Sequence, residues 1–204
     1  MTFAVGIFDL FTYTIPGALY LGFFSYLAFR LHWVDPGAVG RLPTVLLVLI
    51  VVLISYLLGY VGYPAGSWLN RVVPRRRQRR LREEFLGRVP AAKGRAYVDA
   101  DPQILLSAVE LHDRDVALEV SRLRAAGLML RNSAPPLVLG FVAAIVEVFA
   151  GPRPVLAIGC AAVFAVATIA LITQGRRLGH WAGFKTLELA FWLPDVDEKT
   201  AGPR

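Results

Sequence analysis

The sequence predicts an all-α polytopic membrane protein, with four transmembrane helices in two hairpins and a small helical cytoplasmic module between them. Apolar runs and charge are separated along the chain: 56% of its residues are hydrophobic, yet its formal net charge is +7. The apolar runs approach or exceed the roughly 20 helical residues that cross the hydrocarbon layer. One dense basic stretch, Arg71 to Arg82, separates the two predicted hairpins.

The first predicted hairpin covers residues 1–66, and its first span is Phe8 to Trp33. Asp9 suits a helix N-terminus, where a carboxylate meets unpaired backbone donors. Pro16 removes a backbone hydrogen bond, so we expect a kink or a break there. The second span, Leu42 to Tyr63, has a core that is apolar on every face.

Residues 67–134 form the predicted basic helical module. Arg75 to Val89 can form a short basic helix, and Pro90 to Asp101 is expected to be a loop. Asp101 followed by Pro102 is typical of a helix start, with an N-cap and a proline in the first turn. Apolar residues at helical spacing then predict two helices or one bent helix as far as Leu130. A module of this size buries little core by itself, so we expect it to pack on the hairpins or on other subunits.

The second predicted hairpin covers residues 135–175. Its third span, Pro135 to Ala150, is short, and the preceding helix can extend it. The fourth span is Val155 to Thr173. The cytoplasmic tail, residues 176–204, contains a further predicted helix, His180 to Leu193, which is expected either at the membrane interface or on the module.

Lysine and arginine in the loops predict the orientation. The arginine-rich module, Arg176 and Arg177 are expected on one side, and mainly Arg41 and Arg153 on the other. The positive-inside rule then puts the module and both termini in the cytoplasm.

The basic stretch contains the candidate ligand-binding residues. One interpretation is a topology signal that also touches anionic lipid heads. Another is recognition of an anionic ligand such as a nucleotide or oligonucleotide, because the arginine fork matches phosphate oxygens. Duplex binding is disfavoured because no recognition element accompanies the charge. The candidates are Arg75, Arg76, Arg77, Arg79, Arg80 and Arg82.

Glu147 is the candidate pore residue, because it interrupts an otherwise apolar span. An ionised carboxylate facing lipid is costly, so this side chain should face protein, water or an arginine. One interpretation is a ring of carboxylates along a cation path in an oligomer. The other is that Glu147 reaches the outer interface or pairs with Arg153.

Catalytic and metal-binding patterns are not found in the sequence. The lone cysteine, Cys160, excludes an intramolecular disulfide framework and a multi-cysteine metal site. His112 and His180 lack partner spacing for zinc or for a nucleophile triad, and no HExxH, P-loop, GxSxG or GxGxxG motif occurs. We therefore expect a protein that is not an enzyme and needs no cofactor or metal.

The two-hairpin layout, with Ile15-Pro16-Gly17 near its start and Arg131-Asn132 before the second hairpin, resembles small four-helix membrane proteins of bacteria. Some of these are effectors of antiphage systems that use nucleotide signals, the membrane partner of the Hailong system among them. The resemblance implies an oligomeric channel or membrane-disrupting effector in the bacterial plasma (inner) membrane, controlled by a cytoplasmic nucleotide or oligonucleotide. The competing expectation is a non-conducting membrane anchor or scaffold that recruits a cytoplasmic partner protein.

Overall fold

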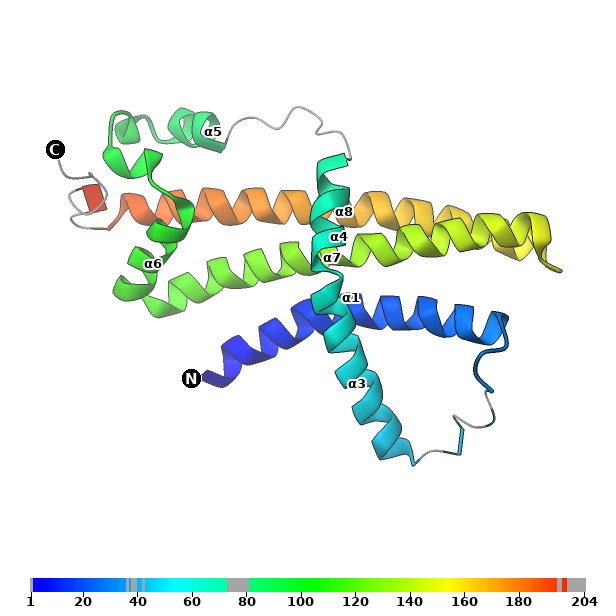
Figure 1. Cartoon of the computed structure of the whole chain (residues 1–204). Coiled ribbons are helices and arrows are strands. Elements are labelled where there is room, and N and C mark those ends of the chain that lie inside the picture. Colours follow the sequence, from blue (N-terminus) through cyan, green and yellow to red (C-terminus); the bar gives the residue numbers. More distant parts are fainter. Residues whose placement is uncertain are drawn as a thin grey trace. The chain divides into compact units, whose positions relative to one another are not determined.

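The computed structural model describes residues 2–35, 37, 40–41, 43–72, 81–193 and 196–197, and within them it is all-α, as predicted. The described residues form seven α-helices and two short 3-10 helices (Figure 1). In order they are α1 (Thr2–Arg30), α3 (Thr44–Val61), α4 (Tyr63–Val72), α5 (Leu81–Arg88), η1 (Pro90–Ala92), η2 (Ala96–Asp99), α6 (Pro102–His112), α7 (Arg114–Ala150) and α8 (Pro154–Phe191).

The chain forms two compact units. The first, here called the apolar unit, contains residues 1–73 and 128–175. The second, called the module, contains residues 74–127 and 176–204. Helices α7 and α8 each contribute to both units, because the boundaries at 127–128 and 175–176 fall inside them.

Three helices are long and apolar enough to cross a membrane: α3, α7 and α8. This agrees with the prediction of a helical membrane protein. Helix α1, expected as the first span, is not among the three found in the described part of the chain. Almost every apolar side chain of α3 is exposed, as in Val45, Leu49 and Leu53, which suits a helix surrounded by lipid or by other copies.

Helix α1 continues through Pro16 as one helix, so a break at this proline is not found. Pro16 is completely buried, and α1 packs closely on α3 in this region. That packing compensates for the backbone hydrogen bond that proline removes. The helix begins at Thr2, so the prediction that Asp9 marks a helix N-terminus is wrong.

The predicted start of α6 is confirmed. The Asp101 carboxylate accepts a hydrogen bond of 2.7 Å from the backbone N–H of Gln103, and proline follows the cap. Two helices, and not one bent helix, follow. They are separated at Asp113, whose Oδ1 accepts bonds from the N–H groups of Asp115 (3.0 Å) and Val116 (3.2 Å). Asp113 therefore caps the new helix α7.

Helices α7 and α8 are longer than the sequence predicts. Helix α7 runs through the pair at Pro135 and Pro136, so the third span is the end of a 37-residue helix. The fourth span and the expected tail helix form one 38-residue helix, α8. Gly175 and Gly179 lie inside it, and neither interrupts it, because glycine lowers helix propensity by only about 1 kcal/mol.

The module has a hydrophobic core of its own. Phe85 of α5, Tyr97 of η2 and Leu105 of α6 are fully buried, and Phe184 and Leu187 of α8 pack against them. The end of α8 therefore docks on the module, which was one of the two predicted alternatives for the tail. The core of the module contains residues from both of its segments, 74–127 and 176–204.

Candidate functional site

The first candidate site lies in the apolar unit around Glu147, near the end of α7. Its Oε2 accepts a hydrogen bond of 3.4 Å from the Tyr26 hydroxyl and lies 3.5 Å from Nε of Arg30. The Glu147 side chain is 26% exposed and that of Arg30 is 49% exposed. The carboxylate thus has an arginine partner, as an ionised group in an apolar span requires. The partner is Arg30 of α1 and not Arg153.

An apolar groove begins at this pair. It has a volume of about 670 Å³ and is lined by α1, by the second half of α7 and by the start of α8, all within the apolar unit. Its walls are mostly small or apolar, including Gly22, Gly140 and Phe164, while Tyr26, Glu147 and Arg153 are polar groups on its lining. A concave apolar site with a few polar groups is the usual form of a binding pocket.

A second polar position in the same unit involves Arg131 and Asn132. Asn132 is completely buried, and neither of its amide atoms has a hydrogen-bond partner among the described residues. The Arg131 guanidinium carbon lies 5.1 Å from the centre of the Tyr63 ring, which is a cation–π distance. Gly66 of α4 leaves room for the Asn132 side chain, because a Cβ there would lie 2.5 Å from Oδ1.

The arginine cluster is described only at its end. Arg75, Arg76, Arg77, Arg79 and Arg80 lie outside the described residues. Arg82 lies in the first turn of α5, and its Nη2 donates a 2.9 Å hydrogen bond to Asp99. Both side chains are more than half exposed, so this ion pair contributes little to stability. The structure therefore brings Arg82 together with Asp99 and places it in the module, whereas Glu147 lies in the apolar unit.

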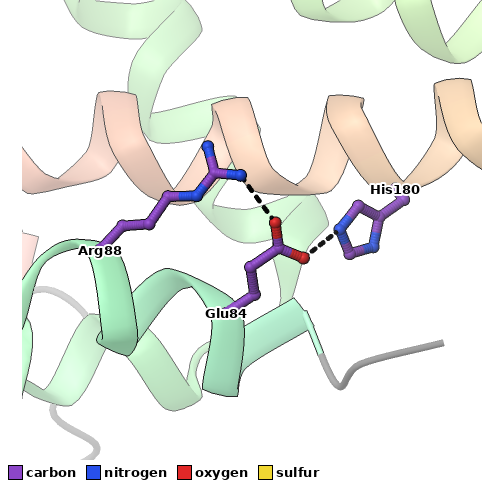
Figure 2. A network of polar contacts seen from close by, with 3 residues as sticks. All are labelled: Glu84, Arg88 and His180. Carbon is purple, nitrogen blue, oxygen red and sulfur yellow. Dashed lines mark hydrogen bonds and ion pairs between the residues drawn. The ribbon is translucent and has the colours of Figure 1, made fainter.

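The module contains a polar network that links α5 to α8. Glu84 accepts a 2.9 Å bond from Arg88 on one oxygen, and Nε2 of His180 lies 2.9 Å from the other oxygen (Figure 2). The bond with His180 holds the pKa of the Glu84 carboxyl below its ordinary value, although desolvation opposes this. Arg88 also lies 4.7 Å from the ring centre of Phe184. These contacts hold the module end of α8 against α5.

Arg95 and Asp197 form a second link within the module. Nε of Arg95 donates a 2.7 Å bond to Asp197, and the Tyr97 N–H donates a 3.2 Å bond to the same carboxylate. Partial burial raises the pKa of Asp197, but these hydrogen bonds outweigh it and the net pKa lies below the ordinary value. The residues after α8 are thereby tied to η2.

The sequence analysis missed both links in the module. His180 was dismissed because it has no partner spacing, yet its partner, Glu84, lies 96 positions earlier in the chain. Only the docking of α8 on α5 brings the two together, and the available signal was the apolar pattern of the tail helix. Among the residues described, no three His, Cys, Asp or Glu side chains gather as a metal site would require.

Comparisons with known proteins return no match: no protein-family model matches the chain, and neither a curated protein nor a solved structure matches it.

Proposed function

We propose that this chain is an oligomeric membrane ion channel or membrane-disrupting effector, regulated through its basic module by an anionic ligand such as a nucleotide or oligonucleotide. The observation that carries the proposal is that α7 and α8 pass from the module into the apolar unit without a loop. Hinges are usually a few residues in loops or at the ends of elements. A ligand-induced change in the module would thus reach the apolar helices through continuous backbone hydrogen bonds.

The ligand class is inferred from charge. Five arginines lie among residues 75–80, and the guanidinium fork suits phosphate oxygens. Arg82 is paired with Asp99, so we assign the ligand contacts to the five arginines that precede it in the sequence. A ligand shifts a closed–open equilibrium only by its differential affinity for the two states. In the sequence the cluster lies between α4 and α5.

Several copies would be needed for conduction. The apolar segments of α3, α7 and α8 each contain at most two charged residues, and Glu147 is already paired with Arg30. A pore would therefore form around an axis between subunits, with closed symmetry. In that assembly Glu147 would line the cation path or lie beside it.

The proposal is tested by flux from liposomes that contain the purified chain, with and without a panel of mono-, di- and oligonucleotides. We expect ligand-dependent cation flux, and reduced cation selectivity for Glu147→Gln. Glu188→Gln is the matched control, because this carboxylate lies at the module end of α8 and pairs with Lys185. An absence of flux with every ligand, together with unchanged membrane potential in expressing cells, would contradict the channel proposal.

The second candidate function is a membrane anchor that recruits a cytoplasmic protein. Two exposed apolar side chains of α6 favour this function. Ile104 is 60% exposed and Leu111 is 90% exposed. Residues seven positions apart share one face of a helix, so these two side chains would form an apolar contact for a partner. Replacing both with serine should abolish recruitment if the chain is an anchor, and should leave flux unchanged if it is a channel.

A further inference from the structure

The length of the groove in the apolar unit, measured along α7 and α8, is close to the thickness of one lipid leaflet. Along α8 it extends from the turn before Pro154 to Phe164, which at 1.5 Å per residue is about 15 Å. Along α7 it extends from Glu147 to Pro136, which is about 16 Å. The hydrocarbon core of a bilayer is about 30 Å thick, so one leaflet contributes about 15 Å. The groove thus matches the length over which an acyl chain runs beside a membrane protein.

The charged groups in and beside the groove carry a net positive charge, because Glu147 and Arg153 line it and Arg30 lies beside it. Glu147 is balanced by Arg30, its ion-pair partner. Arg153 lies in the turn between α7 and α8 and lines the groove, and no ion pair or side-chain hydrogen bond involves it within the described residues. One guanidinium is therefore left without a counter-charge. Arginine presents a fork of donors that matches phosphate oxygens.

We propose that the groove binds one anionic phospholipid, with an acyl chain between α1, α7 and α8 and the phosphate on Arg153. The apolar walls exclude water and favour the acyl chain, and the unbalanced guanidinium favours a headgroup with net negative charge over a zwitterionic one. This inference is independent of whether the chain conducts ions.

The volume of the groove fits one small ligand such as a lipid chain. It is about 670 Å³. That volume lies within the range of small-ligand sites, about 300–1,000 Å³.

The test is native mass spectrometry of the full chain after reconstitution in nanodiscs with equal amounts of phosphatidylglycerol and phosphatidylcholine. We expect phosphatidylglycerol to remain bound in preference to phosphatidylcholine. Arg153→Gln should reduce that preference about tenfold, which corresponds to about 1.4 kcal/mol. Arg41→Gln is the matched control, because Arg41 is also an exposed loop arginine but does not line the groove. An unchanged preference in Arg153→Gln would overturn the assignment of the phosphate.

A second pair of variants tests the acyl chain. Gly22 lines the groove, and a Cβ there meets nothing within 4 Å, so Gly22→Phe should fill the space and reduce bound lipid several-fold. Gly159 on α8 has the same freedom, is exposed and does not line the groove, so Gly159→Phe should leave bound lipid unchanged. Equal lipid retention in both variants would overturn the proposal. It would also be overturned if Gly22→Phe prevented association with a second copy of the chain but did not reduce bound lipid. Thermal melting of each variant separates loss of lipid from loss of fold.

Discussion

Gly59 of α3 faces the backbone carbonyl of Tyr13 of α1 so closely that a Cβ on Gly59 would overlap the carbonyl oxygen. Gly17 of α1 stands in the same relation to the carbonyl of Ser55 of α3. The two helices therefore meet backbone to backbone, and both contacts depend on glycine having no side chain. Tyr13 adds ring contacts to Tyr56 and Tyr60, with centroids 6.0 and 5.6 Å apart.

We predict that Gly59→Ala separates α1 from α3 and destabilises the apolar unit by about 1–3 kcal/mol or more, as overpacking does. The obstacle is backbone, which cannot rotate away as a side chain can. Gly22→Ala on α1 is the matched control and should be neutral or stabilising, because its Cβ meets nothing within 4 Å and alanine favours the helix. The measurement is the melting temperature in detergent. Equal melting temperatures for both variants would show that the α1–α3 contact is looser than described.

The docking of α8 on the module gives a second prediction. Phe184 is 8% exposed and lies edge-on to Phe85 at 5.7 Å, so Phe184→Ala should cost about 3–5 kcal/mol of the module's unfolding free energy. Trp192→Ala removes a larger ring that is 77% exposed and should change it by less than about 0.5 kcal/mol. Denaturant unfolding of both variants checks this. A larger effect at Trp192 would indicate that the tail lies at the membrane interface instead.

Tyr97 allows a sharper check of the same core. Its ring is completely buried, yet its hydroxyl has no hydrogen-bond partner in the described residues. A buried unsatisfied hydroxyl is costly, so Tyr97→Phe should be neutral or stabilising by up to about 1–3 kcal/mol. Tyr97→Ala should instead be strongly destabilising, because it leaves a cavity. Both are measured by denaturant unfolding, and a large loss in Tyr97→Phe would reveal a bond to the hydroxyl.

The Glu84 network predicts how the module responds to acid. The folded-state pKa of Glu84 lies below its ordinary value of 4.5, so its contribution to stability is present above that pH. The contribution is lost as the pH falls through the lower, folded-state pKa. Glu84→Gln should therefore lower stability at neutral pH and flatten the profile below about pH 5. Glu110→Gln, at an exposed position of α6, is the matched control. The readout is denaturant unfolding followed by Trp181 fluorescence, with the other tryptophans replaced by phenylalanine.

The positions of the helices follow from the sequence more readily than their lengths. The Leu42–Tyr63 prediction agrees with α3 because an apolar run between a proline and glycines marks both ends. The cap at Asp101 is equally local. The extension of the third span by the preceding helix is confirmed, but the sequence alone does not show that α7 passes through Pro135 and Pro136, because that depends on the burial of these residues. Local sequence cannot report tertiary packing of this kind.

In the candidate site, too, one part is predicted by the sequence and another is found only in the structure. The sequence singles out Glu147 because a carboxylate in an apolar span is costly wherever it lies. Its partner, Arg30, lies 117 positions away and is found only in the folded chain, where this side chain of α1 reaches Glu147. Glu84 and His180 carry no signal of their own in the sequence, because each is an ordinary polar residue whose partner lies 96 positions away. Long-range pairs of this type become visible only in the folded chain.

The last prediction concerns the arginine cluster. If the module binds phosphate groups, replacing Arg75, Arg76 and Arg77 with glutamine should weaken nucleotide binding and make its salt dependence shallower, because fewer counterions are released. Ligand-dependent flux from liposomes should fall with it. Insertion into the membrane should survive, since the remaining cluster arginines still favour the orientation that the positive-inside rule predicts.

Lysine at the same three positions is the matched control. Lysine keeps the charge but not the paired donors, so a phosphate site should lose affinity with lysine as well, though less than with glutamine. A contact with lipid heads depends mainly on charge, so it should tolerate lysine and respond only to glutamine. Binding titrations and flux at two salt concentrations separate the two cases. If both sets of variants leave nucleotide binding and flux unchanged, the regulatory interpretation of the cluster is wrong.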